Sequence, residues 1–231
     1  GPGASGRAVE QARMRKIFLD VGGHFGQTLE EVLKPLYQFD VIYCFEPFPP
    51  CFEILQDTFD DPRLTLLPYG LSNVTGSLTF HSNGAGDMGS SVKAHDGDQK
   101  SIVTECPFVE ASAFFRDHIR DDDLVVMKLN CEGSECDIMN DLIDSGEASK
   151  IGNVMIDFDV RKYPNHTHEE PALKARMAET GFTNFSLCEE VMRGGRGHQG
   201  RIANWLRSIP WHDQFRPRAR WPERVRGALR L

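Results

Sequence analysis

A glycine-rich turn with an acid just before it is the first feature of the sequence that could take part in chemistry. Gly22, Gly23 and Gly26 follow a short apolar run, and Asp20 stands two residues before the first glycine. A turn between a strand and a helix brings bare backbone and a positive helix end up to a nucleotide-like ligand. Asp20 would attract an ammonium group and repel a pyrophosphate. The turn therefore favours S-adenosylmethionine, although a purely structural strand-to-helix turn is the alternative interpretation.

A second acid closes the next apolar run. Glu46, followed by Pro47, comes 26 residues after Asp20. Nucleotide-binding folds place a carboxylate near this position, where it binds the two ribose hydroxyls. Such a contact is bidentate and charge-assisted. The sequence predicts this role for Glu46, and an exposed acid at a strand end is the alternative.

A third apolar run, beginning at Leu124, carries polar residues on alternate positions of its second half. These are Lys128, Asn130 and Glu132. In an open parallel sheet the C-terminal ends of the strands form the ligand crevice. Buried polar groups are costly unless they have partners. For Lys128, a buried ion pair with a neighbouring acid and a functional role both remain open.

The elements that must position these residues alternate between strand and helix. Strands are predicted over residues 15–21, 41–47, 64–72, 77–81, 154–160, 182–188 and 202–209, besides the run from Leu124. Helices are predicted over 28–38, 49–59, 110–119, 136–143 and 169–180. This pattern is typical of an α/β fold with helices on both faces of a parallel sheet. Residues 81–100 are rich in Gly, Ser, Asp and Asn and are predicted to form a loop over the ligand.

Composition and charge limit the classes of function. The chain has 231 residues, 40% hydrophobic and 26% charged, with a net charge of −8, which is ordinary for a globular domain. Its last part, from Arg193, contains ten arginines, no lysine and two acids. The acidic remainder argues against a nucleic-acid partner, whereas the basic tail could contact an anionic acceptor or partner.

Three segments are expected along the chain. Residues 1–13 read as a flexible leader or tag remnant, residues 14–210 as the main domain and residues 211–231 as an arginine-rich appendage. No apolar run approaches the length of a membrane span. Six cysteines without Cys-x-x-Cys spacing favour free thiols in a reducing, cytoplasmic setting.

Four motifs in order resemble the FkbM-type S-adenosylmethionine-dependent methyltransferases. They are Phe18-Leu-Asp-Val-Gly-Gly with Gly26, then Phe45-Glu-Pro47, then Gly70-Leu-Ser-Asn with Gly76, and then Lys128-Leu-Asn-Cys-Glu-Gly-Ser-Glu135. The last is similar to the family's Lys-Ile-Asp-Val-Glu-Gly-x-Glu, except that Asn130 stands where the family has aspartate. The resemblance covers roughly residues 15–209. It implies a Rossmann-like class I methyltransferase fold, with a mostly parallel seven-stranded sheet that ends in an antiparallel hairpin.

The resemblance also implies an activity and a set of site residues. The activity is O-methylation of a hydroxyl on a sugar, a glycan or a polyketide-type small molecule. The catalytic candidates are Glu132, Asn130, Lys128 and Asp157, with Glu132 favoured as the base that accepts the hydroxyl proton. The candidates for binding the cofactor are Asp20, Gly22, Gly23, His24, Gly26, Glu46, Pro47, Leu71, Ser72 and Asn130.

Several alternatives stay open at this point. Asp157, Asp159, His166 or His168 could serve as the base in place of Glu132. Asn130, Asp157 and Asp159 could hold Mg²⁺ through oxygen ligands, although a reaction without metal is favoured. Two other functions compete, namely a nicotinamide-dependent oxidoreductase that uses the same turn and Glu46, and a non-catalytic cofactor-binding protein with a basic partner-binding tail.

Overall fold

The computed structural model describes residues 14–82 and 102–210. The predicted leader, the predicted appendage and nearly all of the predicted loop over residues 81–100 lie outside the described residues. Within them the chain alternates strand and helix, and the α/β prediction is confirmed. The described part contains no helix that is both long enough and apolar enough to cross a membrane.

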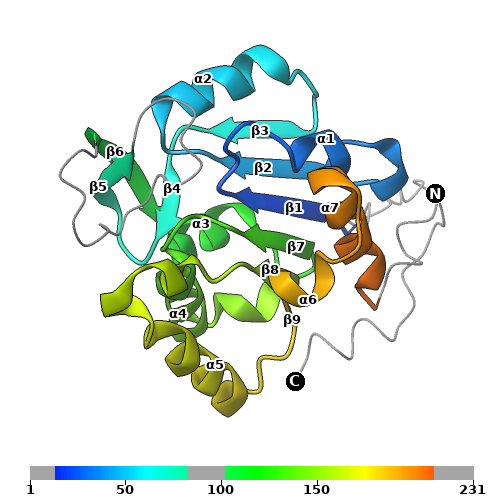
Figure 1. Ribbon diagram of the computed structural model, residues 1–231. Coiled ribbons are helices and arrows are strands. Elements are labelled where there is room, and N and C mark those ends of the chain that lie inside the picture. The colour runs from blue at the N-terminus through cyan, green and yellow to red at the C-terminus, as the bar shows by residue number, and fades with distance from the viewer. Residues whose placement is uncertain (1–13, 83–101, 211–231) are drawn as a thin grey trace, which may run out of the picture.

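A parallel sheet of six strands forms the centre of the molecule (Figure 1). Its strands are β1 (Lys16–Val21), β2 (Val41–Phe45), β3 (Leu64–Leu67), β7 (Leu124–Leu129), β8 (Ile151–Ile156) and β9 (Phe185–Leu187). They lie in the order β3-β2-β1-β7-β8-β9, and all the pairings are parallel. This is the strand order of a doubly wound Rossmann fold. Every residue of β1, β7 and β8 is buried, as expected for strands covered on both faces.

A second, smaller sheet stands beside the first. Its strands are β4 (Gly70–Ser72), β5 (Gly76–Ser82) and β6 (Ile102–Glu110), in the order β4-β6-β5. The strand predicted over residues 64–72 is therefore two strands that belong to different sheets. The turn at Pro68 and Tyr69 carries the chain from one sheet to the other, and β6 was not predicted.

Helices cover both faces of the large sheet. One face packs in an apolar core with α3 (Ala111–His118), α4 (Glu135–Ser145) and α5 (Glu169–Thr180). The other packs with α1 (Leu29–Val32), α2 (Pro49–Thr58) and α7 (Gly197–Ser208). Shorter elements connect them: α6 (Cys188–Val191) and the 3₁₀ turns η1 (Pro35–Tyr37), η2 (Glu147–Lys150), η3 (Asp159–Lys162) and η4 (Pro164–His166).

The predicted ending of the fold is wrong. Residues 202–209 were expected to form the last strand of an antiparallel hairpin, but they lie almost entirely in α7. Ile202, Trp205, Leu206 and Ile209 are buried together, which is the i, i+3, i+4, i+7 spacing of a helix face. The indole of Trp205 donates a hydrogen bond to the side-chain oxygen of Asn153 in β8 at 3.1 Å. In the described residues the large sheet therefore has six strands and no antiparallel one.

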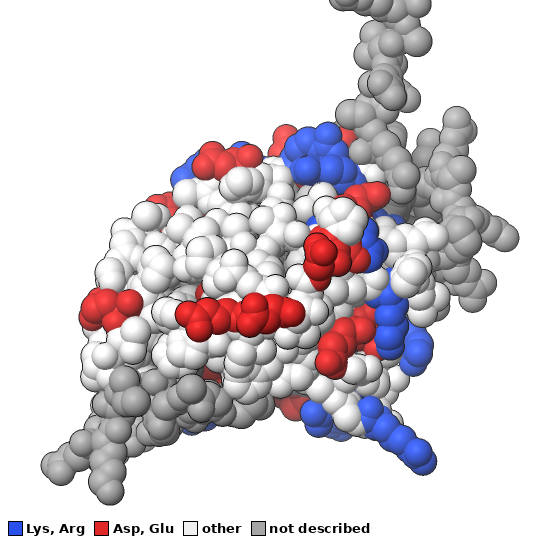
Figure 2. Space-filling view, turned by 90° about the horizontal axis from the view of Figure 1, so that it is seen from above, with Lys and Arg blue, Asp and Glu red and all other residues white. Residues whose placement is uncertain are grey.

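The face over α2 is only lightly charged. Figure 2 shows separate acidic side chains on a mostly uncharged surface, with basic side chains toward its margins. The described residues on this face thus form no continuous basic patch of the kind that binds a nucleic-acid backbone.

Candidate functional site

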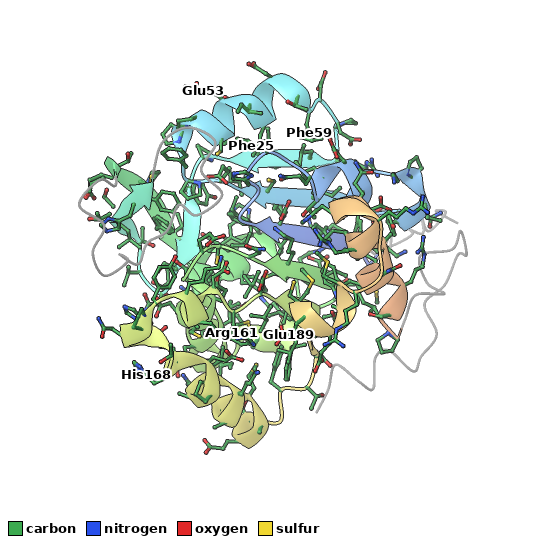
Figure 3. All side chains as sticks on the ribbon, viewed as in Figure 1. Phe25, Glu53, Phe59, Arg161, His168 and Glu189 are labelled. Carbon is green, nitrogen blue, oxygen red and sulfur yellow. The ribbon has the colours of Figure 1, made fainter. Side chains whose placement is uncertain are left out.

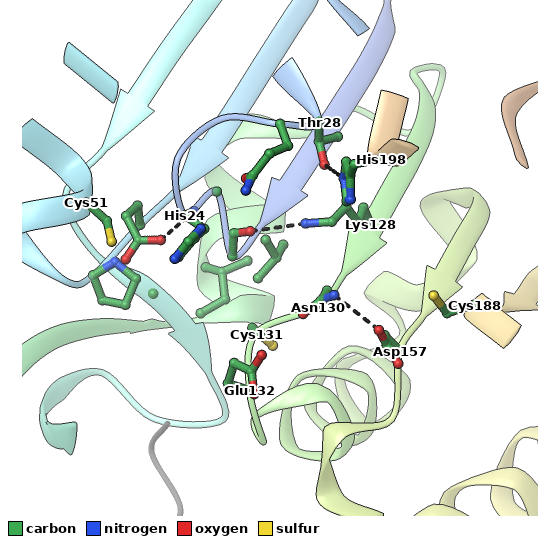
Figure 4. A pocket seen from close by; sticks show the side chains of 18 of the residues that line it. His24, Thr28, Cys51, Lys128, Asn130, Cys131, Glu132, Asp157, Cys188 and His198 are labelled. Carbon is green, nitrogen blue, oxygen red and sulfur yellow. Dashed lines mark hydrogen bonds between the residues drawn. The ribbon is translucent and has the colours of Figure 1, made fainter. Parts of the chain in front are cut away.

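A cavity of about 530 Å³ opens at the C-terminal ends of the parallel strands. This is the edge where doubly wound sheets bind their ligands, and the volume lies within the usual range for small-molecule sites. The cavity joins segments that are far apart in the sequence (Figure 4). Its lining includes Gly22, Gly23 and His24 from the turn, Glu46 and Pro47 after β2, Leu71 in β4, Lys128 in β7, Asn130 and Glu132 after β7, and Asp157 after β8.

The glycine turn brings the backbones of two strand ends into close contact. A Cβ at Gly22 would lie 1.9 Å from the carbonyl oxygen of Asn130, and the φ of Gly22 is +89°. Only glycine tolerates both conditions. The N–H groups of Gly22 and Gly23 both donate to the carbonyl of Phe45, at 3.1 and 3.0 Å, and that of Gly26 donates to the carbonyl of Gly23. The turn is therefore tied to β2 by its own backbone.

Glu46 is a buried carboxylate held by the backbone around it. Its two oxygens accept the N–H groups of His24 at 2.7 Å and of Phe48 at 2.8 Å. Burial raises the pKa of Glu46 to about 7, even though both of these hydrogen bonds act to lower it. Each carboxylate oxygen can accept a further hydrogen bond. Glu46 can thus receive two hydroxyl groups from a ligand in the cavity.

Aromatic side chains line the cavity beside Glu46. Phe48 precedes α2, and Phe80 and Phe108 come from the second sheet; all three are buried and line the cavity. The rings of Phe48 and Phe80 have centroids 5.8 Å apart. Sequence reasoning missed Phe80 and Phe108 because no motif marks them. They reach the cavity only because β5 and β6 fold against the large sheet.

Asp20 does not line the cavity, so the structure gives no support to its predicted role as a partner of a ligand's ammonium group. The register of β1 and β7 places it opposite Lys128, whose ammonium group lies 2.8 Å from Asp20 Oδ1 and 3.0 Å from the carbonyl of Gly22. Both side chains are buried. The ammonium group that Asp20 attracts belongs to the protein itself, and the interpretation of Lys128 as half of a buried ion pair is confirmed.

Glu132 stands at the cavity wall in a strained backbone conformation. Its φ is +55°, which is uncommon for a residue with a side chain. A carboxylate oxygen of Glu132 accepts from Lys162 at 3.0 Å, and Lys162 also lies 2.7 Å from Asp159 Oδ1. Burial and the charge of Asp159 raise the pKa of Glu132 to about 7, although Lys162 acts to lower it. A carboxylate with this pKa can both accept and release a proton near neutral pH.

The loop that presents Glu132 is held from behind by Glu135. One oxygen of this buried carboxyl accepts the N–H groups of Cys131 at 3.2 Å and of Gly133 at 3.1 Å. Burial raises the pKa of Glu135 to about 8. Glu135 therefore fixes the backbone on both sides of Glu132. It positions Glu132 in its unusual conformation without lining the cavity itself.

Asn130 and Asp157 form a direct pair across the ends of β7 and β8. The amide of Asn130 donates to Asp157 Oδ2 at 3.1 Å. Asp159, the third member of the possible Mg²⁺ set, instead contacts Lys162. Among the described residues there is no group of three or more His, Cys, Asp or Glu side chains arranged to hold a metal ion.

The last wall of the cavity comes from the segment after β9 and from the first turns of α7. A hairpin turn had been predicted over residues 194–200 of this region. The residues that form this wall are Cys188, Glu189, Met192, Arg193, His198 and Arg201. His198 Nε2 lies 3.0 Å from the hydroxyl of Thr28, which ties α7 to the helix after the glycine turn. Arg161 of η3 lies 2.8 Å from Glu189 of α6, and Figure 3 shows the two side by side.

Most of the predicted site residues meet at this cavity. Three of them do not line it: Asp20, Gly26 and Ser72. A Cβ at Gly26 would lie 2.1 Å from the ring of Phe59, so this glycine serves the packing of the turn against α2. Ser72 is buried. Of the alternative bases, Asp157 lines the cavity, while Asp159, His166 and His168 do not; Figure 3 shows His168 at the outer margin of the molecule.

No protein-family model matches the sequence, and no curated protein matches it. One solved structure is similar to the chain: the crystal structure of methyltransferase FkbM from Methylobacillus flagellatus. The two share 15% sequence identity with a TM-score of 0.41, and the similarity covers 70% of this chain and 37% of that one. The chain therefore spans a little over a third of that protein's length. This similarity is too distant to assign the chain to a family.

Proposed function

We propose that this protein is an S-adenosylmethionine-dependent O-methyltransferase that acts on a hydroxyl group of a sugar, a glycan or a polyketide-type small molecule. The observation that carries the proposal is the meeting of the glycine turn, Glu46 and the segment 128–132 at one cavity. These are the segments that resemble the FkbM-type motifs. Their chemistry divides the cavity into a part suited to a nucleoside and a part suited to proton transfer.

The part around Glu46 suits the adenosine of the cofactor. The buried carboxylate can accept both ribose hydroxyls while it keeps its two backbone hydrogen bonds. Phe48, Phe80 and Phe108 offer an apolar, aromatic surface on which a purine ring can stack. Leu71, also part of a quoted motif, lines the same cavity.

The part at the ends of β7 and β8 suits the acceptor. When bound, S-adenosylmethionine would supply an electrophilic methyl group. Glu132 would accept the proton of the attacking hydroxyl, because its pKa of about 7 makes it a base at neutral pH. The Asn130–Asp157 pair leaves the carbonyl of Asn130 and the second oxygen of Asp157 to orient the acceptor.

A nicotinamide-dependent oxidoreductase is the second candidate, because one observation favours it. The strand order of the large sheet is that of classic dinucleotide-binding domains. Such domains hold a pyrophosphate on the N–H groups of the glycine turn. Here those of Gly22, Gly23 and Gly26 donate to backbone carbonyls, and that of His24 donates to Glu46. The carboxylate of Glu46, which accepts from His24, would also repel a pyrophosphate. We therefore rank this candidate second.

Calorimetric titration of the full chain distinguishes the candidates. We expect S-adenosylmethionine and S-adenosylhomocysteine to bind and NAD to give no heat of binding. Methyl transfer is then measured on a panel of sugars and polyhydroxylated compounds, with and without a chelator. Binding of NAD in place of S-adenosylmethionine would overturn the proposal. Tight binding of S-adenosylmethionine with no transfer to any acceptor would favour a non-catalytic cofactor-binding protein.

A further inference from the structure

Four basic side chains line the cavity, and they differ in whether they have a positive charge available for a ligand. They are Lys128, Arg193, His198 and Arg201. The ammonium group of Lys128 is neutralised by Asp20 and also donates to the carbonyl of Gly22. His198 is uncharged at neutral pH, since burial and the nearby charges of Lys128 and Arg201 lower its pKa to about 4. The two arginines are therefore the basic side chains with charge left for a ligand.

Arg201 has no hydrogen bond or ion pair to any other described residue. Within the same part of the chain, the guanidinium of Arg193 contacts only the backbone carbonyl of Glu189, through Nε. The remaining N–H groups of both side chains can serve a ligand. A guanidinium matches the planar geometry of a carboxylate.

The backbone under these two arginines is well fixed. The amide of Asn204 in α7 donates to the carbonyl of Arg193 at 2.9 Å. A Cβ at Gly195 would lie 2.4 Å from the backbone N of Arg201, so the loop before α7 packs tightly against the first turns of that helix. The Thr28–His198 contact then holds α7 to the glycine turn. The backbone that carries Arg193 and Arg201 is thus fixed at the cavity wall.

The order of the strands indicates which part of a ligand reaches this end. Glu46 follows β2, the glycine turn follows β1, and Lys128 and Asn130 lie at the end of β7. Neighbouring strands lie about 4.8 Å apart, so a ligand with its ribose at Glu46 crosses the end of β1 toward β7. There it meets the segment 188–201, which runs from the end of β9 back to Thr28.

We infer that Arg193 and Arg201 bind the carboxylate of the amino-acid portion of S-adenosylmethionine. This inference rests on the proposed function, because it assumes that the cavity holds that cofactor. It assigns a role in cofactor binding to the segment 188–201, which lies outside the four sequence motifs.

At the strand ends Lys128 is paired with Asp20, and the other charged lining groups are the acids Glu46, Glu132 and Asp157. Glu189 lines the same wall as the two arginines but is paired with Arg161. The wall that carries the two arginines is therefore the place for an anionic group.

Calorimetry with two ligands tests the inference without measuring catalysis. S-adenosylhomocysteine carries the carboxylate, and S-adenosylthiopropylamine is the same compound without it. We expect the natural chain to prefer the first by roughly 10- to 100-fold, the range for hydrogen bonds between charged groups. In the double variant Arg193→Gln, Arg201→Gln, the affinity for S-adenosylthiopropylamine should be unchanged, and the preference should fall to about onefold.

The control is Arg207→Gln, which removes an exposed arginine from the same helix outside the cavity; it should keep the full preference. Retained binding of S-adenosylthiopropylamine shows that the double variant is folded. The conservative variant Arg201→Lys should keep part of the preference for S-adenosylhomocysteine. A double variant with the natural preference would overturn the inference and leave the proposed function standing. If the natural chain binds neither compound, the proposed function fails as well.

Discussion

Two lysine–carboxylate pairs each contribute one residue to the cavity lining, Lys128 in the first and Glu132 in the second, and they differ in how far they are buried. Lys128 and Asp20 lie 2.8 Å apart and are both buried. Lys162 and Glu132 lie 3.0 Å apart, but their side chains are 49% and 20% exposed. In the first pair the two buried charges neutralise each other. The second pair leaves a carboxylate at the cavity with a pKa of about 7, so burial rather than residue type separates the structural pair from the chemical one.

The largest effect is expected from Glu132→Gln, which removes the base and keeps the shape of the side chain. Turnover should fall by roughly 10²–10⁴-fold, the usual contribution of a general base, while the affinity for the cofactor stays the same. Methyl transfer to a panel of sugars and calorimetry on the same preparation measure both quantities. Full activity in this variant would exclude Glu132, and Asp157 would then be the next candidate in the cavity.

Lys128→Met tests the structural pair. It leaves Asp20 buried without its cation, which should lower the free energy of unfolding by about 3–5 kcal/mol. Glu132→Gln is the matched control: it removes the charge of the partly exposed pair and leaves Lys162 with Asp159, so it should cost no more than about 1 kcal/mol. Urea denaturation measures both. Equal losses in the two variants would contradict the distinction between the pairs.

The site residues that were predicted from sequence and those that were missed differ in what places them at the cavity. Glu46, Glu132 and the glycines were found from sequence because each follows a buried strand, and parallel strands end at one edge of a sheet. Asp20 could not be identified from sequence as the partner of Lys128, because the sequence does not give the register of β1 against β7. Pairing across the sheet decides whether its charge meets a ligand or Lys128.

The C-terminal wall could not be predicted for a different reason. Residues 202–209 have apolar side chains at spacings that suit a helix, yet the expected methyltransferase ending favoured a strand. The glycines from 194 to 200 suggested a hairpin turn, whereas Gly195 packs closely against Gly200 and Arg201 in the first turns of α7. Arg193, His198 and Arg201 were therefore missed, although a helical reading of residues 197–208 would have placed His198 and Arg201 three residues apart on one face.

A smaller effect is expected in the pH dependence of turnover. Glu132 acts as a base only when it is ionised, so the rate should rise with pH through about 7, the pKa of this carboxyl. Lys162 favours the ionised form, and Lys162→Met should shift this rise to higher pH by less than about one unit. A shift to lower pH would contradict the assignment. The rate is measured between pH 5 and 9.

The smallest effect on the fold is expected from Asn130→Asp, which restores the residue of the FkbM-type motif. The change removes the hydrogen bond from the Asn130 amide to Asp157, at a cost of about 1 kcal/mol. It also places two carboxylates side by side, which favours a cation between them. We expect thermal unfolding to become sensitive to Mg²⁺ in the variant and not in the natural chain. An equal response of thermal unfolding to Mg²⁺ in the two proteins would show that the residue at position 130 does not determine metal binding.

The central claim is that the cavity holds S-adenosylmethionine with its ribose on Glu46, and calorimetric titration of Glu46→Ala tests it most directly. At pH 8, where this carboxyl is ionised, the variant should bind S-adenosylmethionine more weakly by about 1.5–3 kcal/mol. Glu53→Ala, an exposed acid on α2 (Figure 3), is the control and should bind as the natural chain does. Thermal unfolding of Glu46→Ala confirms that the variant is folded. Unchanged affinity in folded Glu46→Ala would contradict the claim.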